Sequence, residues 1–382
     1  MAAQRWDIFC KVVDNFGDAG VCWRLARQLV AEHDLAVTLW IDVLASLARI
    51  APTLSTDLDE QTIAGVRVRR WPQDRAEVAL PQVVVEAFGC GLPERYLEAM
   101  ADAPRAPVWI NLEYLSAEPW VDSAHGLPSP QPHLPLTRHF YFPGVTGNSG
   151  GLLRERDLVG ERERSRREGH ARASMLRALG VAKPPAYALV ATLFCYPNLA
   201  LPALLDAWVE GEAPLVCLVP EGVATAALDA WTGGNVPQPG QSITHGPLTV
   251  TAIPFVDQDA YDRLLWKSDL NFVRGEDSFI RAQWAARPLV WHIYPQADDA
   301  HRVKLDEFLA RYRAGLDAAT FEAIEAFWHA WTEGDGARAA SAWPAYRASL
   351  PAQAEHAGAW ADRLAAQPDL AGSLVQFACD RL

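Results

Sequence analysis

Short runs of almost wholly apolar residues recur through the first half of the chain, and segments with helical spacing separate them. A run that is apolar throughout is typical of a parallel strand buried on both faces. After the first run, Val21, Leu25 and Leu29 lie on one face of a predicted helix, for which Asp18 is the expected N-cap. The predicted strands are residues 6–13, 37–42, 66–71, 83–88, 108–111 and 139–142.

A second series of the same kind follows residues 183–185 (Lys-Pro-Pro), which we interpret as a linker. Its predicted strands are residues 187–193, 215–219, 248–253, 270–273 and 289–294. Two consecutive series predict an α/β fold with two Rossmann-like domains that face each other across a cleft. We expect one domain over residues 1–180, a second over 181–355, and a helical segment, 356–382, that packs back on the first.

Two further segments have unusual compositions. Residues 128–135 contain four prolines, which predicts a loop without regular structure. Residues 154–172 carry seven arginines and five acidic residues. For these we favour a solvated helix with many ion pairs over the alternative, a phosphate-binding site.

Charge and cysteine usage limit the classes of partner. Among 382 residues, 34 Lys and Arg stand against 47 Asp and Glu, a net charge of −13, which argues against a nucleic-acid or membrane-surface binder. The six scattered cysteines contain no C-x-x-C pair, so buried free thiols are favoured over disulfides or zinc. The N-terminus lacks a signal-peptide pattern, and we therefore expect a cytoplasmic protein. The 15 tryptophans are unassigned, and for most of them packing is the favoured role.

The loop after the first predicted strand carries two carboxylates four residues apart, Asp14 and Asp18, within the sequence D-N-F-G-D-A-G. In an open α/β sheet, such a loop lines the ligand crevice, and its glycines permit a tight turn. The two carboxylates are candidates for a general base and its supporting partner. The spacing agrees equally well with a purely structural role, in which Asp18 caps the helix and Asp14 holds the turn. The full G-x-G-x-x-G dinucleotide pattern is absent.

A similar strand, loop and helix start lies at residues 271–279. Asp277 or Ser278 is the expected N-cap, which leaves backbone N–H groups available for an anion, and Arg274 adds fork-shaped donors for a phosphate. Glu276 would repel phosphate, so a sugar hydroxyl is its expected partner. The pattern favours a nucleotide-diphosphate site over a structural capping loop.

Three aromatic residues, Phe194, Tyr196 and Phe255, each follow a predicted strand of the second series. They could stack on a nucleobase while Gln258 bonds its edge, although core packing is favoured by sequence alone. Asp257-Gln258-Asp259 looks like a D-x-D metal motif, but its place in a second Rossmann-like domain argues against that role. We expect no metal and no cofactor.

Taken together, these motifs resemble the protein-arginine rhamnosyltransferases that modify translation elongation factor P. The resemblance spans both domains and rests on D-N-F-G-D-A-G, F-C-Y-P at residues 194–197, I-P-F-V-D-Q at 253–258 and R-G-E-D-S-F at 274–279. It implies a GT-B fold and transfer of L-rhamnose from dTDP-β-L-rhamnose to one arginine of elongation factor P, with inversion.

The resemblance also implies residue roles. Asp18 is similar to the catalytic base, Asp14 to its support, and Glu276 to a further essential carboxylate. The residues that the resemblance places at the donor are Asn15, Phe16, Gly17, Phe194, Tyr196, Phe255, Gln258, Arg274, Gly275, Glu276, Asp277 and Ser278. The alternatives are a GT-B enzyme for another sugar and acceptor, and a non-catalytic nucleotide-sugar-binding protein.

Overall fold

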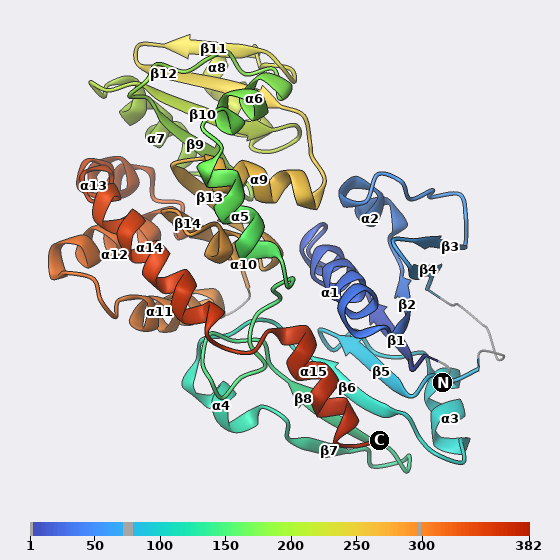
Figure 1. Ribbon diagram of the computed structural model, residues 1–382. Helices are drawn as coiled ribbons and strands as arrows, with labels where there is room; N and C mark the ends of the chain where they lie inside the picture. The colour runs from blue at the N-terminus through green and yellow to red at the C-terminus, as the bar shows by residue number, and fades with distance from the viewer. Residues whose placement is uncertain (1–2, 72–78, 297–298) are drawn as a thin grey trace. The chain divides into compact units, whose positions relative to one another are not determined.

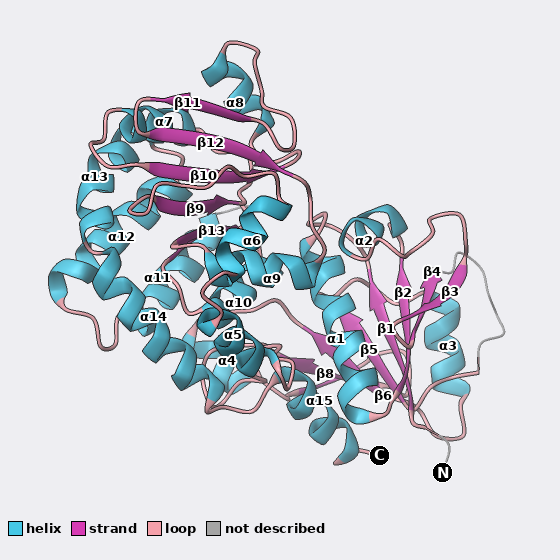
Figure 2. Cartoon of the chain, turned by 45° about the horizontal axis from the view of Figure 1, so that its top comes forward, coloured by secondary structure: helices cyan, strands magenta, loops and turns pink. Residues whose placement is uncertain are grey.

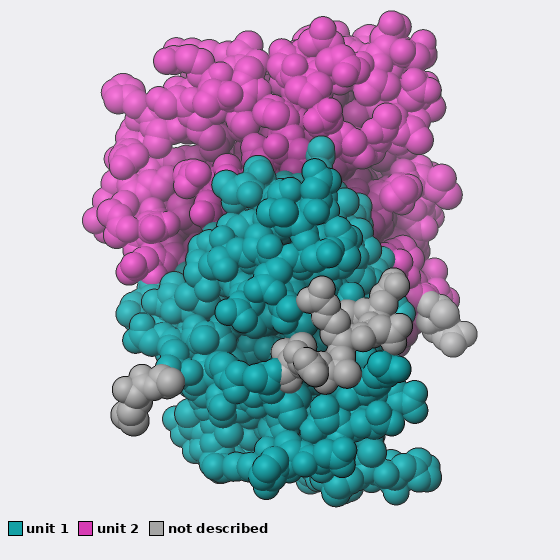
Figure 3. Space-filling view, turned by 90° about the vertical axis from the view of Figure 1, so that its right-hand side faces the viewer, with its two compact units in different colours: residues 1–156, 364–382 teal, residues 157–363 magenta. Residues whose placement is uncertain are grey.

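The chain forms two compact units in a computed structural model that describes residues 3–71, 79–296 and 299–382. Unit 1 comprises residues 1–156 and 364–382, and unit 2 comprises residues 157–363 (Figure 3). This division differs from the expected one: unit 2 begins well before residue 181, and the chain returns to unit 1 at Leu364. Each unit is an α/β layer structure with a largely parallel sheet, which confirms the predicted α/β fold with two Rossmann-like domains.

Unit 1 is built on an eight-stranded sheet in the order β3-β4-β2-β1-β5-β6-β8-β7. The six predicted strands are confirmed and form the parallel centre, and β3 and β7 add antiparallel edges. The expectation for residues 128–135 was wrong in part, because Pro128–Pro130 pairs at the sheet edge, where proline is tolerated. The strands are β1 (Arg5–Cys10), β2 (Ala36–Ile41), β3 (Glu60–Ile63), β4 (Val66–Arg70), β5 (Val83–Ala87), β6 (Val108–Leu112), β7 (Pro128–Pro130) and β8 (Thr137–Tyr141).

Helices cover the sheet of unit 1, and the last of them comes from the C-terminal end of the chain (Figure 1). The helices are α1 (Gly17–His33), α2 (Leu44–Ile50), α3 (Glu94–Asp102), α4 (Pro119–Ala124) and α15 (Leu370–Cys379). Asp369, the N-cap of α15, accepts a hydrogen bond of 3.0 Å from Gln28 on α1. The ring of Phe377 lies 5.2 Å from that of Tyr141 at the end of β8. The C-terminal helix is therefore a layer of unit 1.

Unit 2 has a six-stranded sheet in the order β11-β12-β10-β9-β13-β14, parallel except for the edge strand β11 (Figure 2). All five predicted strands are present. The strands are β9 (Leu189–Leu193), β10 (Leu215–Pro220), β11 (Ser242–His245), β12 (Leu248–Ile253), β13 (Leu270–Arg274) and β14 (Leu289–His292). The helices are α5 (Leu158–Arg167), α6 (Ala171–Ala178), α7 (Leu201–Val209), α8 (Thr225–Thr232), α9 (Gln258–Lys267), α10 (Asp277–Ala285), α11 (Ala300–Tyr312), α12 (Ala318–Thr332), α13 (Gly336–Ala348) and α14 (Leu350–Ala365).

The arginine-rich segment is not a simply solvated helix, and the favoured interpretation was wrong in this respect. Arg162 on α5 is buried and donates to the carbonyl of Trp284, while Arg166 donates to the carbonyls of Ala285 and Ala286. These carbonyls end α10, where cations and extra donors are stabilising. The two arginines therefore attach α5 to unit 2, which explains the early boundary between the units.

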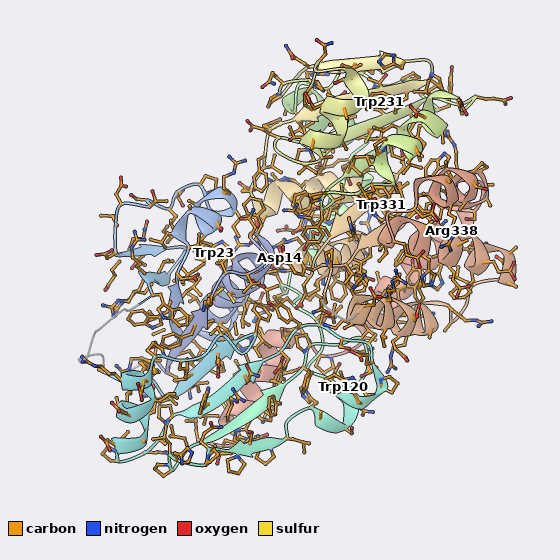
Figure 4. The ribbon with its side chains drawn as sticks, turned by 180° about the vertical axis from the view of Figure 1, so that it is seen from behind. Asp14, Trp23, Trp120, Trp231, Trp331 and Arg338 are labelled. Carbon is orange, nitrogen blue, oxygen red and sulfur yellow. The ribbon has the colours of Figure 1, made fainter. Side chains whose placement is uncertain are left out.

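Tryptophan packing and free thiols agree with the sequence. Twelve of the fifteen tryptophans are buried, on strands and helices of both units; Trp23 on α1 and Trp331 on α12 are two of them (Figure 4). All six cysteines are free, and Cys10, Cys22, Cys195 and Cys217 are buried. Over the described residues, every helix is too short or too polar to cross a membrane.

Candidate functional site

Asp18 lies in the first turn of α1, one residue after the helix begins, and is not the N-cap that the sequence suggested. Its side chain turns back over the loop that leaves β1. One oxygen, Oδ2, accepts hydrogen bonds from the backbone N–H groups of Val13 at 2.7 Å and Asp14 at 2.8 Å. The residue is only 1% exposed. A carboxylate buried with such donors is held in one orientation.

The rest of this loop is tightly shaped. Gly17 donates its N–H to the carbonyl of Asp14 at 2.6 Å, and a Cβ at Gly17 would collide with the Asp14 carboxylate. Asn15 has a positive φ of 23°, and its side-chain oxygen accepts from the hydroxyl of Ser46 at 3.1 Å. Phe16 precedes the helix as its N-cap residue. The bond between Gly17 and Asp14 closes the tight turn, and the lack of a Cβ at Gly17 leaves room for the Asp14 carboxylate. Asp14 lies in the loop that precedes α1 (Figure 4).

The structure adds Tyr114, which the sequence motifs did not single out. Its hydroxyl donates to Oδ1 of Asp18 at 3.1 Å, and its ring stacks on Phe88 with centroids 4.3 Å apart. Nearby, Glu113 accepts from the amide of Asn111 at 2.5 Å. Tyr114 follows β6, two strands from β1 in the sheet. A sequence signal existed, because the ends of parallel strands meet at one edge of the sheet and Tyr114 lies two residues after such a strand, in the stretch N-L-E-Y-L-S.

In unit 2, Arg274 at the end of β13 lies over two aromatic rings. Its guanidinium carbon is 4.4 Å from the ring centre of Phe194 and 4.8 Å from that of Tyr196. One nitrogen also donates to the carbonyl of Cys195 at 3.1 Å. The predicted strand-end arginine and two of the predicted aromatics are therefore brought together. Phe255 is half-buried in the loop after β12.

The loop after β13 leads directly into α10. Gly275 has a φ of 58° in the left-handed region, and its carbonyl accepts from the indole of Trp291 at 2.7 Å. Ser278 accepts from the N–H of Arg274 at 3.0 Å and donates to its carbonyl. Glu276 is the half-buried residue that precedes α10. Because α10 begins at Asp277, neither Asp277 nor Ser278 is the N-cap, which corrects the sequence expectation.

Asp277 belongs to a buried polar network. Its Oδ2 accepts from the amide of Gln258 at 3.0 Å and from Arg281 at 2.9 Å. Arg281 also donates to Asp262 at 2.7 Å. Arg281 is thus shared between two buried carboxylates, and the network fixes the amide of Gln258 next to the start of α10.

Two residues at the end of β14 escaped the motif analysis. The ring of Tyr196 lies 5.4 Å from those of both His292 and Tyr294. Burial, together with the positive charge of Arg274, lowers the pKa of His292 to about 3, so its imidazole is neutral at physiological pH. Arg274 and His292 are register partners on adjacent strands. The sequence could have indicated both residues, because they lie at or near the carboxyl end of the predicted strand 289–294. That end lies at the same edge of the sheet as the carboxyl end of the parallel strand β13.

The two loops therefore assemble separately, one within each unit. The D-x-D look-alike has a local explanation, because Asp257 caps α9 by accepting from the N–H of Ala260 at 2.8 Å. Within the described part of the chain, no three side chains of the types His, Cys, Asp and Glu come together as a metal would require.

Known proteins match the whole chain. A family model for the elongation factor P rhamnosyltransferase EarP matches residues 6–379. The protein-arginine rhamnosyltransferase of Pseudomonas putida is 49% identical over 97% of this chain and 98% of that protein. The protein of the same name from Pseudomonas aeruginosa is 47% identical over 99% of each.

A solved structure is similar as well. It concerns EarP-mediated arginine glycosylation of translation elongation factor EF-P, is 38% identical, and covers 99% of each chain with a TM-score of 0.71. These matches confirm the resemblance carried by the motifs of both units. The chain therefore belongs to the EarP family, the rhamnosyltransferases of elongation factor P.

Proposed function

We propose that this protein transfers L-rhamnose from dTDP-β-L-rhamnose to one arginine side chain of elongation factor P, with inversion at the anomeric carbon. The observation that carries the proposal is the buried Asp18 carboxylate, which three donors hold at the loop leaving β1. The names of the relatives support arginine as the acceptor, and the similar solved structure supports elongation factor P. Since the acceptor is a translation factor, we place the reaction in the cytoplasm.

In this proposal, the donor binds to the loop between β13 and α10. Arg274 presents a planar guanidinium beside Phe194 and Tyr196 at the end of β13, and the backbone N–H groups at the start of α10 favour an anion. Ser278 shapes the loop around the diphosphate. We assign Phe194, Tyr196, Phe255 and Gln258 to the nucleotide, and Gly275, Glu276 and Asp277 to the sugar end. The family resemblance also assigns Asn15, Phe16 and Gly17 to the donor.

The acceptor guanidinium is a poor nucleophile, and the carboxylates of the site are proposed to activate it. A guanidinium has a pKa above 12 and no free lone pair, so one base does not simply deprotonate it before attack. We propose that Asp18 and a second carboxylate clamp the guanidinium and localise its charge, with Asp14 supporting Asp18. The N–C bond to the anomeric carbon forms as the bond to the diphosphate oxygen breaks. The nitrogen gives its proton to Asp18 as the bond forms, and dTDP leaves with its electron pair.

Negative charge develops on the diphosphate as it leaves, and groups of this chain can stabilise that charge. Arg274 and the start of α10 stabilise the developing negative charge, and Glu276 holds the sugar. The proposal therefore assigns no step to a metal or a cofactor, and dTDP-rhamnose is the only small molecule that it requires.

Intact-mass measurement of elongation factor P incubated with this protein and dTDP-rhamnose tests the activity. One deoxyhexose added on arginine is the expected product. Transfer of another sugar, or donor binding without transfer, would instead favour the alternative enzyme or the non-catalytic binding protein.

Asp18→Asn tests the residue assignment. The variant should bind the donor normally and lose about 10²- to 10⁴-fold in turnover, the range typical for removal of a general base. The matched control is Asp7→Asn, which changes another buried carboxylate of unit 1; this one is bonded to Trp40 and Tyr96 and lies away from the loop. An Asp18→Asn enzyme with wild-type turnover would exclude Asp18 as the base.

A further inference from the structure

The hydrogen bonds of Asp18 are divided unequally between its two oxygens. Oδ2 accepts from two backbone N–H groups, those of Val13 and Asp14, and Oδ1 accepts from the hydroxyl of Tyr114. A carboxylate offers about four lone-pair sites, two on each oxygen. Both sites of Oδ2 are therefore used, and, counting donors from the described residues, Oδ1 keeps one site for an incoming N–H.

The phenol that occupies the other site of Oδ1 is itself firmly placed. The Tyr114 ring stacks on Phe88 with an interplanar angle of 10°. Phe88 has a φ of 58° and donates its N–H to the carbonyl of Leu112 at 2.6 Å, so this loop is tied to the end of β6. Stacking of this kind leaves the hydroxyl little freedom, because the ring has only two torsions to fix.

We propose that Tyr114 is a positioning residue for the transfer reaction: its hydroxyl fixes Oδ1 of Asp18 so that the remaining lone pair faces the acceptor guanidinium. The inference rests on the proposed role of Asp18 as the base. The backbone determines where the carboxylate lies, and Tyr114 determines which lone pair is presented. The hydroxyl also stabilises the ionised carboxylate, which must be unprotonated at the start of each turnover.

Several ionisable groups lie on the elements around Asp18. They include Asp14 and the cation Lys11 on the loop, Cys10 at the end of β1, Cys22 on the next turn of α1, and Glu113, the neighbour of Tyr114 in the chain. Burial raises the pKa of Cys22 well above its ordinary value, and the negative charge of Asp18 adds to that shift. The donors that the structure gives to the Asp18 carboxylate are the hydroxyl of Tyr114 and the backbone N–H groups of Val13 and Asp14.

Tyr114→Phe removes the hydroxyl and keeps the stacked ring. We expect the turnover number of the full chain, with dTDP-rhamnose and elongation factor P, to fall about tenfold with little change in the KM for the donor. The acid limb of the kcat–pH profile should move about half a unit to one unit higher, because a lost hydrogen bond makes the carboxylate easier to protonate. A merely structural role would leave that limb in place.

The matched control is Tyr96→Phe, which removes the hydroxyl that donates to Asp7 at 2.8 Å elsewhere in unit 1. It should lose stability without a change in turnover or pH profile. In an Asp18→Asn background, Tyr114→Phe should have no further effect on residual transfer, because both changes act on one group.

The results for these variants distinguish failure of the proposed base, Asp18, from failure of the proposed role of Tyr114. If Asp18→Asn keeps turnover, the proposed base is wrong. If Asp18→Asn is inactive and Tyr114→Phe matches wild type in both kcat and acid limb, the tyrosine inference alone is overturned. A further tenfold loss on combining the two changes would also overturn it, since Tyr114 would then act independently of Asp18.

Discussion

The replacement Arg274→Lys tests the donor site most directly. Lysine keeps the positive charge but lacks the planar fork that binds a diphosphate through two parallel hydrogen bonds. In this structure it would also lose the 3.1 Å bond to the carbonyl of Cys195, which anchors one end of the guanidinium. The guanidinium carbon also lies 4.4 Å from the ring centre of Phe194 and 4.8 Å from that of Tyr196, and these cation–π contacts help to fix its orientation.

These contacts set the expected magnitude. A hydrogen bond from a charged group contributes about 1.5–3 kcal/mol. Loss of one such bond to the diphosphate should raise the Kd for the donor about 10- to 100-fold. Lysine can still lie over one ring, so the cation–π contribution of roughly 0.5–1 kcal/mol is partly kept.

Calorimetric titration of dTDP-rhamnose into each variant measures this change. Arg172→Lys is the matched control, because Arg172 forms a two-pronged pair with Asp269 in the same unit, with bonds of 2.9 and 2.6 Å. It should leave the donor Kd unchanged. Wild-type affinity in Arg274→Lys, or an equal loss in both variants, would refute the assignment of Arg274 to the diphosphate.

Three further changes have defined outcomes. Gly17→Ala should displace the Asp14 carboxylate and lower turnover severalfold in the transfer assay, whereas Gly358→Ala on α14, where a Cβ meets open space, should leave turnover unchanged. Arg281→Met leaves two buried carboxylates without their shared partner, so denaturant unfolding should show a loss of about 3–5 kcal/mol. Burial raises the pKa of Asp7 above its ordinary 3.8; the stability from its protonated form is present below pH 3.8 and lost as pH rises through the folded-state pKa. The free energy of unfolding of Asp7→Asn, measured in urea relative to wild type, should therefore be higher at pH 7 than at pH 4.

The sequence predicted best where one physical rule was sufficient. Apolar runs identified the parallel strands, and the loops at their carboxyl ends contained the candidate residues Asp18 and Arg274. Helix starts were less predictable, because Asp18 and Asp277 have the residue type of an N-cap while their side chains bond elsewhere. The local sequence does not show which hydrogen-bond partner such a side chain will have in the folded protein.

Contacts between distant segments were beyond local patterns. The composition of residues 154–172 could not reveal that Arg162 and Arg166 bind carbonyls at the end of α10, more than a hundred residues away. The contact of Tyr114 with Asp18 was not predicted for a similar reason: its place after a strand was readable from the sequence, but the sheet order was not. Long-range polar pairs of this kind depend on the completed fold.

The return of the chain to unit 1 at Leu364 also determines the order in which the parts of the two units are synthesised. All of unit 2 leaves the ribosome before α15, and a nascent chain that ends at residue 363 contains every residue of unit 2 but an unfinished unit 1. Until α15 arrives, Gln28 on α1 lacks its partner Asp369, and Tyr141 lacks the ring of Phe377. Because α15 follows unit 2 in the chain, the packing of unit 1 around the helix that carries Asp18 is completed only after all of unit 2 has been synthesised.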